Sequence, residues 1–101
     1  MVPSFRRTVL PFGPEACTWD EAKDASNFEK HGMNLAAAAQ IFRGEILVRR
    51  DTRVTDEIRH QAIGVVGAWT VFVVYTVRDG APRLISARRA STVEERIYGD
   101  R

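Results

Sequence analysis

The stretch from Trp69 to Val77 constrains the fold more than any other part of the chain. It consists entirely of β-branched and aromatic residues, it is apolar on both faces, and Asp79-Gly80 follows it closely. Such residues favour strands, and a strand without a polar face belongs in the centre of a sheet. The Asp-Gly pair predicts a type I′ turn into a further strand at Arg83–Arg89. We therefore expect Trp69–Arg78 to be a central antiparallel strand that helices cover on one side.

Helix signals precede this sheet. Asp20 is a good N-cap for a helix predicted over Glu21–His31, and Gly32 then suits the left-handed position after its last turn. Asn34 is expected to cap a second, short helix over Leu35–Phe42, whose four alanines permit close packing on a sheet.

The remaining elements complete an α+β order. Strands are predicted over Glu45–Arg50 and Arg59–Val66, with a polar turn at Asp51–Asp56 between them. A short helix is predicted from Ser91-Thr92 to Tyr98. The expected fold is thus two N-terminal helices and a short C-terminal helix packed on a twisted antiparallel sheet of three to five strands.

Length and composition limit the chain to one small domain. It has 101 residues, of which 45% are hydrophobic, and a formal net charge of +2, so two cores and wholesale disorder are both excluded. Residues 1–14 hold three of the four prolines and are expected to form an extended arm, with residues 15–101 as the domain. No apolar run approaches the roughly 20 residues of a membrane helix, and no secretory signal is recognisable. With Cys17 alone, no disulfide is expected, and a cytoplasmic location is predicted.

Arginine dominates the positive charge, since the 15 basic residues are 13 Arg and 2 Lys. A guanidinium binds phosphate at two points, so a polyanionic partner fits this composition, as does codon bias in a GC-rich genome. On the first predicted helix, four residues at i, i+4, i+7 and i+8 share the face turned away from Ala22, Ala25 and Phe28. They are Lys23, Asn27, Lys30 and His31. This stripe either binds a phosphate backbone, with a histidine for proton transfer, or is a solvated helix face.

Alternation along the strands separates neighbouring basic residues. Arg59 is expected on the opposite face from His60, and Arg88, together with Leu84, on the opposite face from Arg89. Ion pairs with nearby glutamates at the rim of the sheet are the structural alternative for these arginines.

No metal or nucleotide motif occurs. There are two histidines, and HExxH, CxxC, P-loop and dinucleotide glycine patterns are all missing, so no cofactor is predicted. Cys17 has no adjacent base and is expected to be a small core residue. Trp69 and Tyr75 share a face of an apolar strand and are expected to pack in the core rather than stack on bases.

RNA cleavage without a metal ion is compatible with these residues. RNA carries its own nucleophile, the 2′-hydroxyl, which attacks the adjacent phosphorus in line. The protein must then place the phosphate, stabilise the additional negative charge and move protons. Arginines, a lysine and a histidine or glutamate are sufficient for these tasks.

Several sequence blocks, in their order, resemble the BrnT toxin family. The blocks are Trp19-Asp20-x-x-Lys23, Asn27-Phe28-x-Lys30-His31-Gly32, Glu57-Ile58-Arg59, Ile63-Gly64, the run from Arg83 to Ala90, and Glu95-Arg96-x-Tyr98. Together they cover about Cys17 to Tyr98. The resemblance implies a fold similar to that of RelE-type ribonuclease toxins. It also implies a type II toxin that cleaves RNA and halts translation.

The same resemblance implies partners and functional positions. It implies RNA as the substrate, neutralisation by BrnA, a ribbon-helix-helix antitoxin, and contact with operator DNA only through that antitoxin. Taken together with the helix stripe, it predicts catalytic residues that converge in one pocket and RNA-binding residues around them. The catalytic set is Lys23, Arg59, Arg88, Glu57 and His31, and the RNA-binding set is Asn27, Lys30, Ser86 and Arg89.

A second hypothesis belongs to a different class. The chain would then be a non-catalytic binding module, a decayed toxin that only docks the antitoxin or a nucleic-acid complex. Cleavage of RNA in the presence of a chelator separates the two hypotheses.

Overall fold

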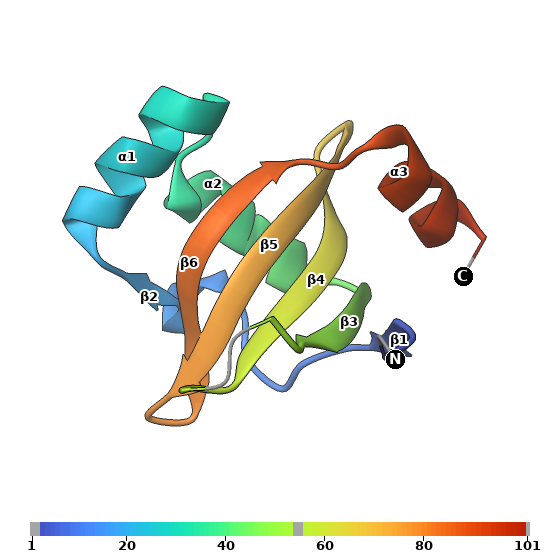
Figure 1. The fold of residues 1–101 in the computed structure, drawn as a ribbon, viewed down its shortest axis with the longest axis horizontal. Helices are drawn as coiled ribbons and strands as arrows, with labels where there is room; N and C mark the ends of the chain where they lie inside the picture. The colour runs from blue at the N-terminus through green and yellow to red at the C-terminus, as the bar shows by residue number, and fades with distance from the viewer. Residues whose placement is uncertain (1–2, 54–55, 101) are drawn as a thin grey trace.

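The computed structural model describes residues 3–53 and 56–100, which form three α-helices and a six-stranded sheet (Figure 1). The strand order is β1-β3-β4-β5-β6-β2. The strands are β1 (Arg6–Thr8), β2 (Thr18–Trp19), β3 (Ile46–Asp51), β4 (Arg59–Val66), β5 (Trp69–Arg78) and β6 (Ala81–Arg89). The helices are η1 (Pro14–Ala16), α1 (Glu21–His31), α2 (Leu35–Ala38), η2 (Ala39–Arg43) and α3 (Thr92–Gly99), with η1 and η2 in 3₁₀ geometry. No helix in this part of the chain is long and apolar enough to cross a membrane.

The sheet has more strands than predicted and is mixed rather than antiparallel. β2 pairs with β6 in parallel, while β1 pairs with β3 antiparallel. β1 lies within the expected N-terminal arm, so this arm, described from residue 3, contributes an edge strand. Both additional strands have only two or three residues, which is too short for a periodic pattern to indicate them.

Local signals placed the first helix and the two hairpins correctly. The Asp20 side chain caps α1 by accepting hydrogen bonds from the backbone nitrogens of Ala22 and Lys23, and Gly32 adopts the left-handed conformation. Asp79 and Gly80 have φ angles of 55° and 80°, as a type I′ turn requires. The polar turn expected at residues 51–56 includes 54 and 55, which lie outside the described residues.

The second helix differs from the prediction. Its α-helical part ends at Ala38 and continues as the 3₁₀ helix η2. Asn34 makes no side-chain cap, and the Asp24 carboxylate of α1 accepts a hydrogen bond from Leu35 N, the first nitrogen of α2, at 2.7 Å. A residue of the neighbouring helix thus satisfies one of the free backbone nitrogens at the start of α2.

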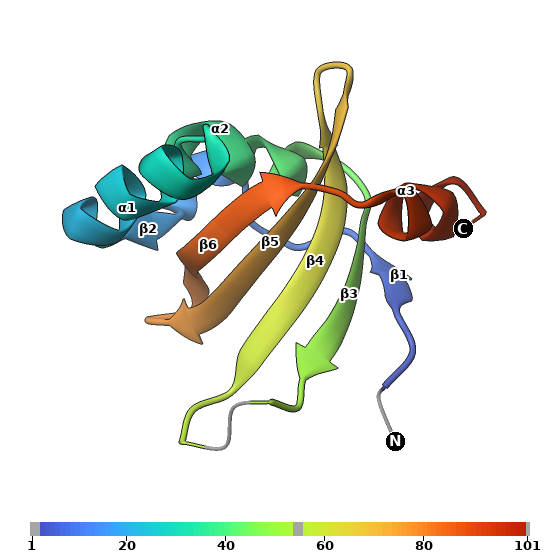
Figure 2. The same ribbon diagram turned by 45° about the horizontal axis from the view of Figure 1, so that its top comes forward.

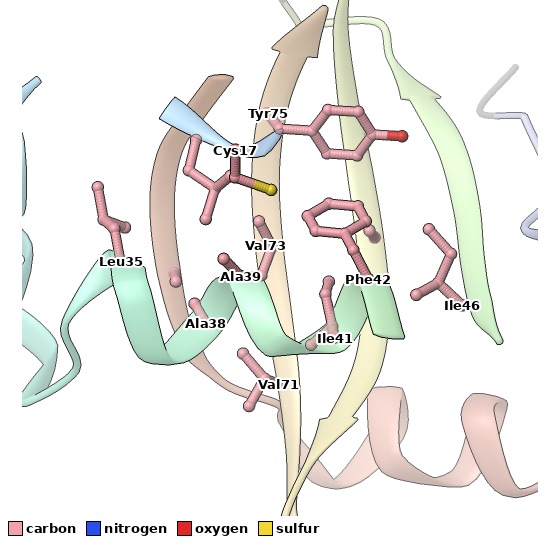
Figure 3. Packing of buried hydrophobic residues seen from close by; sticks show 13 residues of the cluster. Cys17, Leu35, Ala38, Ala39, Ile41, Phe42, Ile46, Val71, Val73 and Tyr75 are labelled. Atoms are coloured by element: carbon pink, nitrogen blue, oxygen red, sulfur yellow. The ribbon is translucent and has the colours of Figure 1, made fainter. Parts of the chain in front are cut away.

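One hydrophobic cluster lies between α2, η2 and the sheet (Figure 3). Leu35 and Ile41 are fully buried there, and the ring of Phe42 meets that of Tyr75 edge-on at 5.3 Å. Gly64 allows this close approach, since a Cβ at that position would lie 2.6 Å from the Cβ of Ile41.

A smaller cluster lies on the opposite face, where α3 packs. Tyr98 of α3 contacts the cluster that contains Ile63 and Phe72, and its hydroxyl donates to the Glu45 carbonyl at 2.9 Å. α3 begins at a capping box formed by Ser91 and Glu94. It packs at the end of this face where β4 finishes, whereas α1 and α2 lie on the other side of the sheet (Figure 2).

Helix α1 is rotated relative to the expectation. Phe28 is 53% exposed, whereas Asn27, predicted to face solvent and to bind RNA, is buried. The Asn27 side-chain amide bonds to both the N–H and the C=O of Ala87 on β6 and also donates to the Met33 carbonyl. A polar side chain thus attaches α1 to β6 where an apolar one was expected. Trp69 also departs from the prediction, being 51% exposed, whereas Tyr75 is buried.

Candidate functional site

A pocket of about 360 Å³ lies where the N-terminal turn of α1 meets the ends of β4, β5 and β6. Its charged lining residues include Asp20, Lys23, Glu57, Arg59, Arg78 and Arg83. Lys23 and Arg59 were predicted as catalytic residues, and they are brought to one cavity from positions 36 apart in the chain. Glu57, also predicted, lies beside them.

The register of the strands explains why three lining residues, Arg59, Thr76 and Arg83, point to the same side of the sheet. Arg59 of β4 pairs with Thr76 of β5, which in turn pairs with Arg83 of β6. Directly opposed residues of neighbouring strands point to the same side of the sheet, so these three form a row across it. This side is the one that carries α3 at its other end.

A β-bulge in β6 decides which arginines face the pocket. Val74 pairs with Ser86 but Tyr75 pairs with Leu84, so Ile85 is the extra residue. Regular alternation placed Arg88 and Leu84 on one face, and the bulge makes that prediction wrong. Because of it, Leu84 joins the core under α2, while Arg83 lies on the same face as Ser86 and Arg88.

The pocket is cationic and partly open to solvent. Arg59 Nε lies 2.6 Å from a carboxylate oxygen of Glu57, and the two side chains are 29% and 35% exposed. Lys23 and Arg83 make no side-chain hydrogen bond or ion pair with any residue in the described part of the chain. Asp20 is already engaged at the start of α1. Arg78 likewise has no such partner among the described residues, and the exposed Asp56 also lines the pocket. The lining therefore holds four cations against three carboxylates, and this small positive excess suits an anionic ligand.

Asp51 continues this row on β3, opposite Arg59. Its buried carboxylate accepts two hydrogen bonds from the Arg53 side chain, at 2.9 and 2.7 Å. The hydrogen bonds from Arg53 hold the pKa of Asp51 well below its usual range, against the opposing effect of burial. The pair fixes the end of β3 beside the pocket.

This pKa shift predicts a pH dependence of folding. A lowered pKa in the folded state stabilises the protein fully above the ordinary carboxyl pKa of about 4. This stabilisation is lost progressively as the pH falls from there towards the lowered pKa of the folded state. We expect Asp51→Asn to reduce the free energy of unfolding by about 1–2 kcal/mol at pH 7. Urea unfolding at pH 7 and pH 3 should show a gap between the stabilities of wild type and variant that is smaller at pH 3, although still present there. An equal gap at both pH values would contradict the role of the Asp51 charge.

Arg88 does not line the pocket, so the expected convergence of Lys23, Arg59 and Arg88 is wrong for Arg88. Its guanidinium makes two hydrogen bonds to Glu94 of α3, at 2.8 and 2.9 Å, and stacks over Phe72 at 4.2 Å. These contacts hold Arg88 at the α3 end of the same sheet face.

The remaining predicted site residues lie elsewhere. Lys30 and His31 are exposed at the C-terminal end of α1, about 10 Å along the helix axis from Lys23. Arg89 is on the opposite face of the sheet, where its guanidinium lies 3.7 Å from the centre of the Trp69 ring. Ser86 is half-buried on the same face as Arg88.

No group of three or more His, Cys, Asp or Glu side chains within residues 3–53 and 56–100 is arranged to hold a metal ion.

Two arginines of the pocket, Arg78 and Arg83, were not predicted from the sequence as site residues. Both flank the Asp79-Gly80 turn, and counting outward from that turn places Arg83 opposite Thr76.

Comparison with known proteins gives a family for most of the chain. A family model described as "Ribonuclease toxin, BrnT, of type II toxin-antitoxin system" matches residues 19–94. The match runs from the end of β2 into α3 and includes every predicted site residue. The search of curated proteins and the search of solved structures gave no match.

Proposed function

The chain belongs to the BrnT family of ribonuclease toxins from type II toxin–antitoxin systems. We propose that it cleaves RNA in the pocket at the end of the sheet and that this cleavage needs no metal ion. The observation that supports this most is the position of Lys23 and Arg83, two unpaired cations, beside the Arg59–Glu57 pair. Cations fixed around a small pocket stabilise the charge that develops on a phosphate as it is attacked.

Each part of the reaction has a candidate group. A phosphate bound in the pocket competes with Glu57 for Arg59 and frees the carboxylate to take the proton from the 2′-hydroxyl. The resulting oxygen attacks phosphorus, and the bond to the 5′-oxygen breaks. Lys23 gives a proton to that leaving oxygen. The products are a 2′,3′-cyclic phosphate and a 5′-hydroxyl end, while Arg59 and Arg83 stabilise the pentacovalent state.

Residues outside the pocket have supporting roles in this proposal. Arg88 and Ser86 lie farther along the same sheet face and are proposed to contact the RNA chain away from the cleaved bond. His31, Lys30 and Arg89 lie too far from Lys23 or on the other face, so they are not assigned to proton transfer.

Membership of this family also implies a protein partner, because a type II toxin is paired with a protein antitoxin. We propose that this antitoxin is of the BrnA type, a ribbon-helix-helix protein, and that operator DNA is bound only through it. Free toxin would cleave cytoplasmic RNA and arrest translation.

The purified chain should cleave a 5′-labelled RNA in 5 mM EDTA, about as fast as in Mg²⁺, and leave cyclic phosphate ends. Product ends are identified by mass spectrometry. Cleavage that requires Mg²⁺ would contradict the metal-free mechanism. Retention of RNA with no new ends would contradict the enzyme and favour the non-catalytic binding module.

A further inference from the structure

A second hollow lies on the other face of the sheet, at the edge formed by β1 and β3. Its volume is about 830 Å³, and its lining includes Arg6, Arg50, His60 and Tyr75. The His60 ring stacks on the Tyr75 ring, with centroids 5.1 Å apart and planes 28° apart. Arg6 and Arg50 are exposed and make no ion pair with any residue that the structure describes. The hollow thus combines unpaired guanidinium groups with an aromatic stack.

A third cavity, of about 440 Å³, lies between this hollow and the proposed catalytic pocket, and we call it the connecting cavity. It shares Glu57, Thr76 and Arg78 with the catalytic pocket. It shares His60 and Val77 with the hollow. Shared lining residues place the three cavities next to one another around the end of β4 and β5. We call this series of cavities the wrapping groove.

We propose that the wrapping groove binds single-stranded RNA on both sides of the sheet end, with the cleaved phosphate in the catalytic pocket, the adjoining nucleotide at the connecting cavity and the next nucleotide of the strand in the hollow. The base of that nucleotide would stack on His60, which Tyr75 supports from behind. Arg50 and Arg6 would bind its phosphates. This inference rests on the proposed function, because it identifies the substrate of that pocket as an extended strand.

The lining favours RNA over a protein partner. A cationic groove with aromatic stacking surfaces is the usual way to bind a single strand without reading every base. No carboxylate is among the described residues that line the hollow, and Glu57 is the one carboxylate of the connecting cavity. Burial and the nearby Arg50 lower the pKa of His60, so its ring is neutral at pH 7 and available for stacking.

Binding is tested with 2′-O-methyl RNA, which the proposed mechanism cannot cleave. Fluorescence anisotropy would compare an eight-nucleotide probe with a dinucleotide on wild type, His60→Ala and Arg50→Ala. We expect each variant to bind the longer probe roughly tenfold more weakly and the dinucleotide unchanged. Arg50→Ala should also lower the slope of log affinity against log salt concentration by about one.

Two further variants control the experiment. Arg43→Ala removes an exposed arginine that lines a different cavity, beside Tyr98, and should bind as wild type does. His60→Phe keeps an aromatic ring and should retain most of the affinity for the longer probe. If the imidazole had only a structural role, His60→Phe would bind as weakly as His60→Ala. Circular dichroism checks that each variant is folded.

Because the probe is not cleaved, this test is separate from that of the nuclease. Wild-type binding of the long probe by both His60→Ala and Arg50→Ala would overturn the wrapping groove, even in an active ribonuclease. Loss of antitoxin affinity in the variants with unchanged RNA binding would overturn it as well and assign the surface to a protein. Weaker binding of the long probe with no cleavage of normal RNA would uphold the groove and reject the proposed nuclease.

Discussion

Replacing Arg59 with alanine is expected to lower the rate of RNA cleavage by about 10²–10³-fold, the usual effect of losing one fixed group that stabilises a transition state. Arg59 is held on the sheet by its pairing with Thr76 and lies 2.6 Å from Glu57, so its removal takes away both a phosphate ligand and the partner of the general base. Single-turnover cleavage of a labelled RNA in EDTA measures the rate. Induction of the variant without its antitoxin should no longer arrest growth.

Comparison with Arg88→Ala sharpens this prediction. Arg88 is bound to Glu94 at the far end of the same face, so its loss should raise KM more than it lowers kcat. Arg59→Lys keeps the charge without the two-point geometry and should retain part of the activity. Growth arrest by Arg59→Ala at wild-type strength would contradict the assignment of the pocket.

Replacing Asn27 with alanine is expected to lower the free energy of unfolding by about 2–4 kcal/mol. Asn27 is 5% exposed and makes three hydrogen bonds, two of them to the backbone of Ala87 in β6. Its removal leaves a buried N–H and two carbonyls without partners, and each unsatisfied group costs about 1–3 kcal/mol, less where water enters. Urea unfolding followed by circular dichroism gives the free energy. This loss is a large part of the total free energy of unfolding of a small domain.

Ser26→Ala is the matched control, because Ser26 is the exposed neighbour on the same helix and its loss should change stability by less than about 0.5 kcal/mol. The sequence suggested that Asn27 binds RNA. Unchanged stability of Asn27→Ala together with weaker RNA binding would restore that interpretation and contradict the structural role.

Elements with complete local signals were predictable. Helix α1 has a capping aspartate at its start and Gly32 at its end, and both work as expected. β4 and β5 were placed at their observed bounds because the turn at residues 67–68 separates them and the Asp79-Gly80 turn follows β5, which is a run of β-branched and aromatic residues up to Val77. A two-residue turn at Asp79-Gly80 also sets the register, so the row of Arg59, Thr76 and Arg83 can be found by counting from the two hairpin turns.

Features that depend on distant residues were not predictable. β1 and β2 exist because β3 and β6 have free edges for them, and neither has a pattern of its own. The bulge at Ile85 places the residues of β6 before it on the opposite face from the one that regular alternation, counted back from Arg88, predicts. No local signal indicated this bulge. The burial of Asn27 depends on the backbone of β6, 60 positions away. The hydrogen bonds between Arg88 and Glu94 likewise depend on how α3 packs against the sheet.

The most direct test of the account is to locate bound RNA on the protein. A titration of the ¹⁵N-labelled chain with 2′-O-methyl RNA, followed by NMR, reports on each backbone amide and on the Arg59 Nε–H. We predict the largest shifts at the catalytic pocket, from residue 56 to Arg59 and at Thr76 and Arg83. Shifts confined to the exposed Trp69 and Arg89 surface, with the Arg59 Nε–H unmoved, would contradict it.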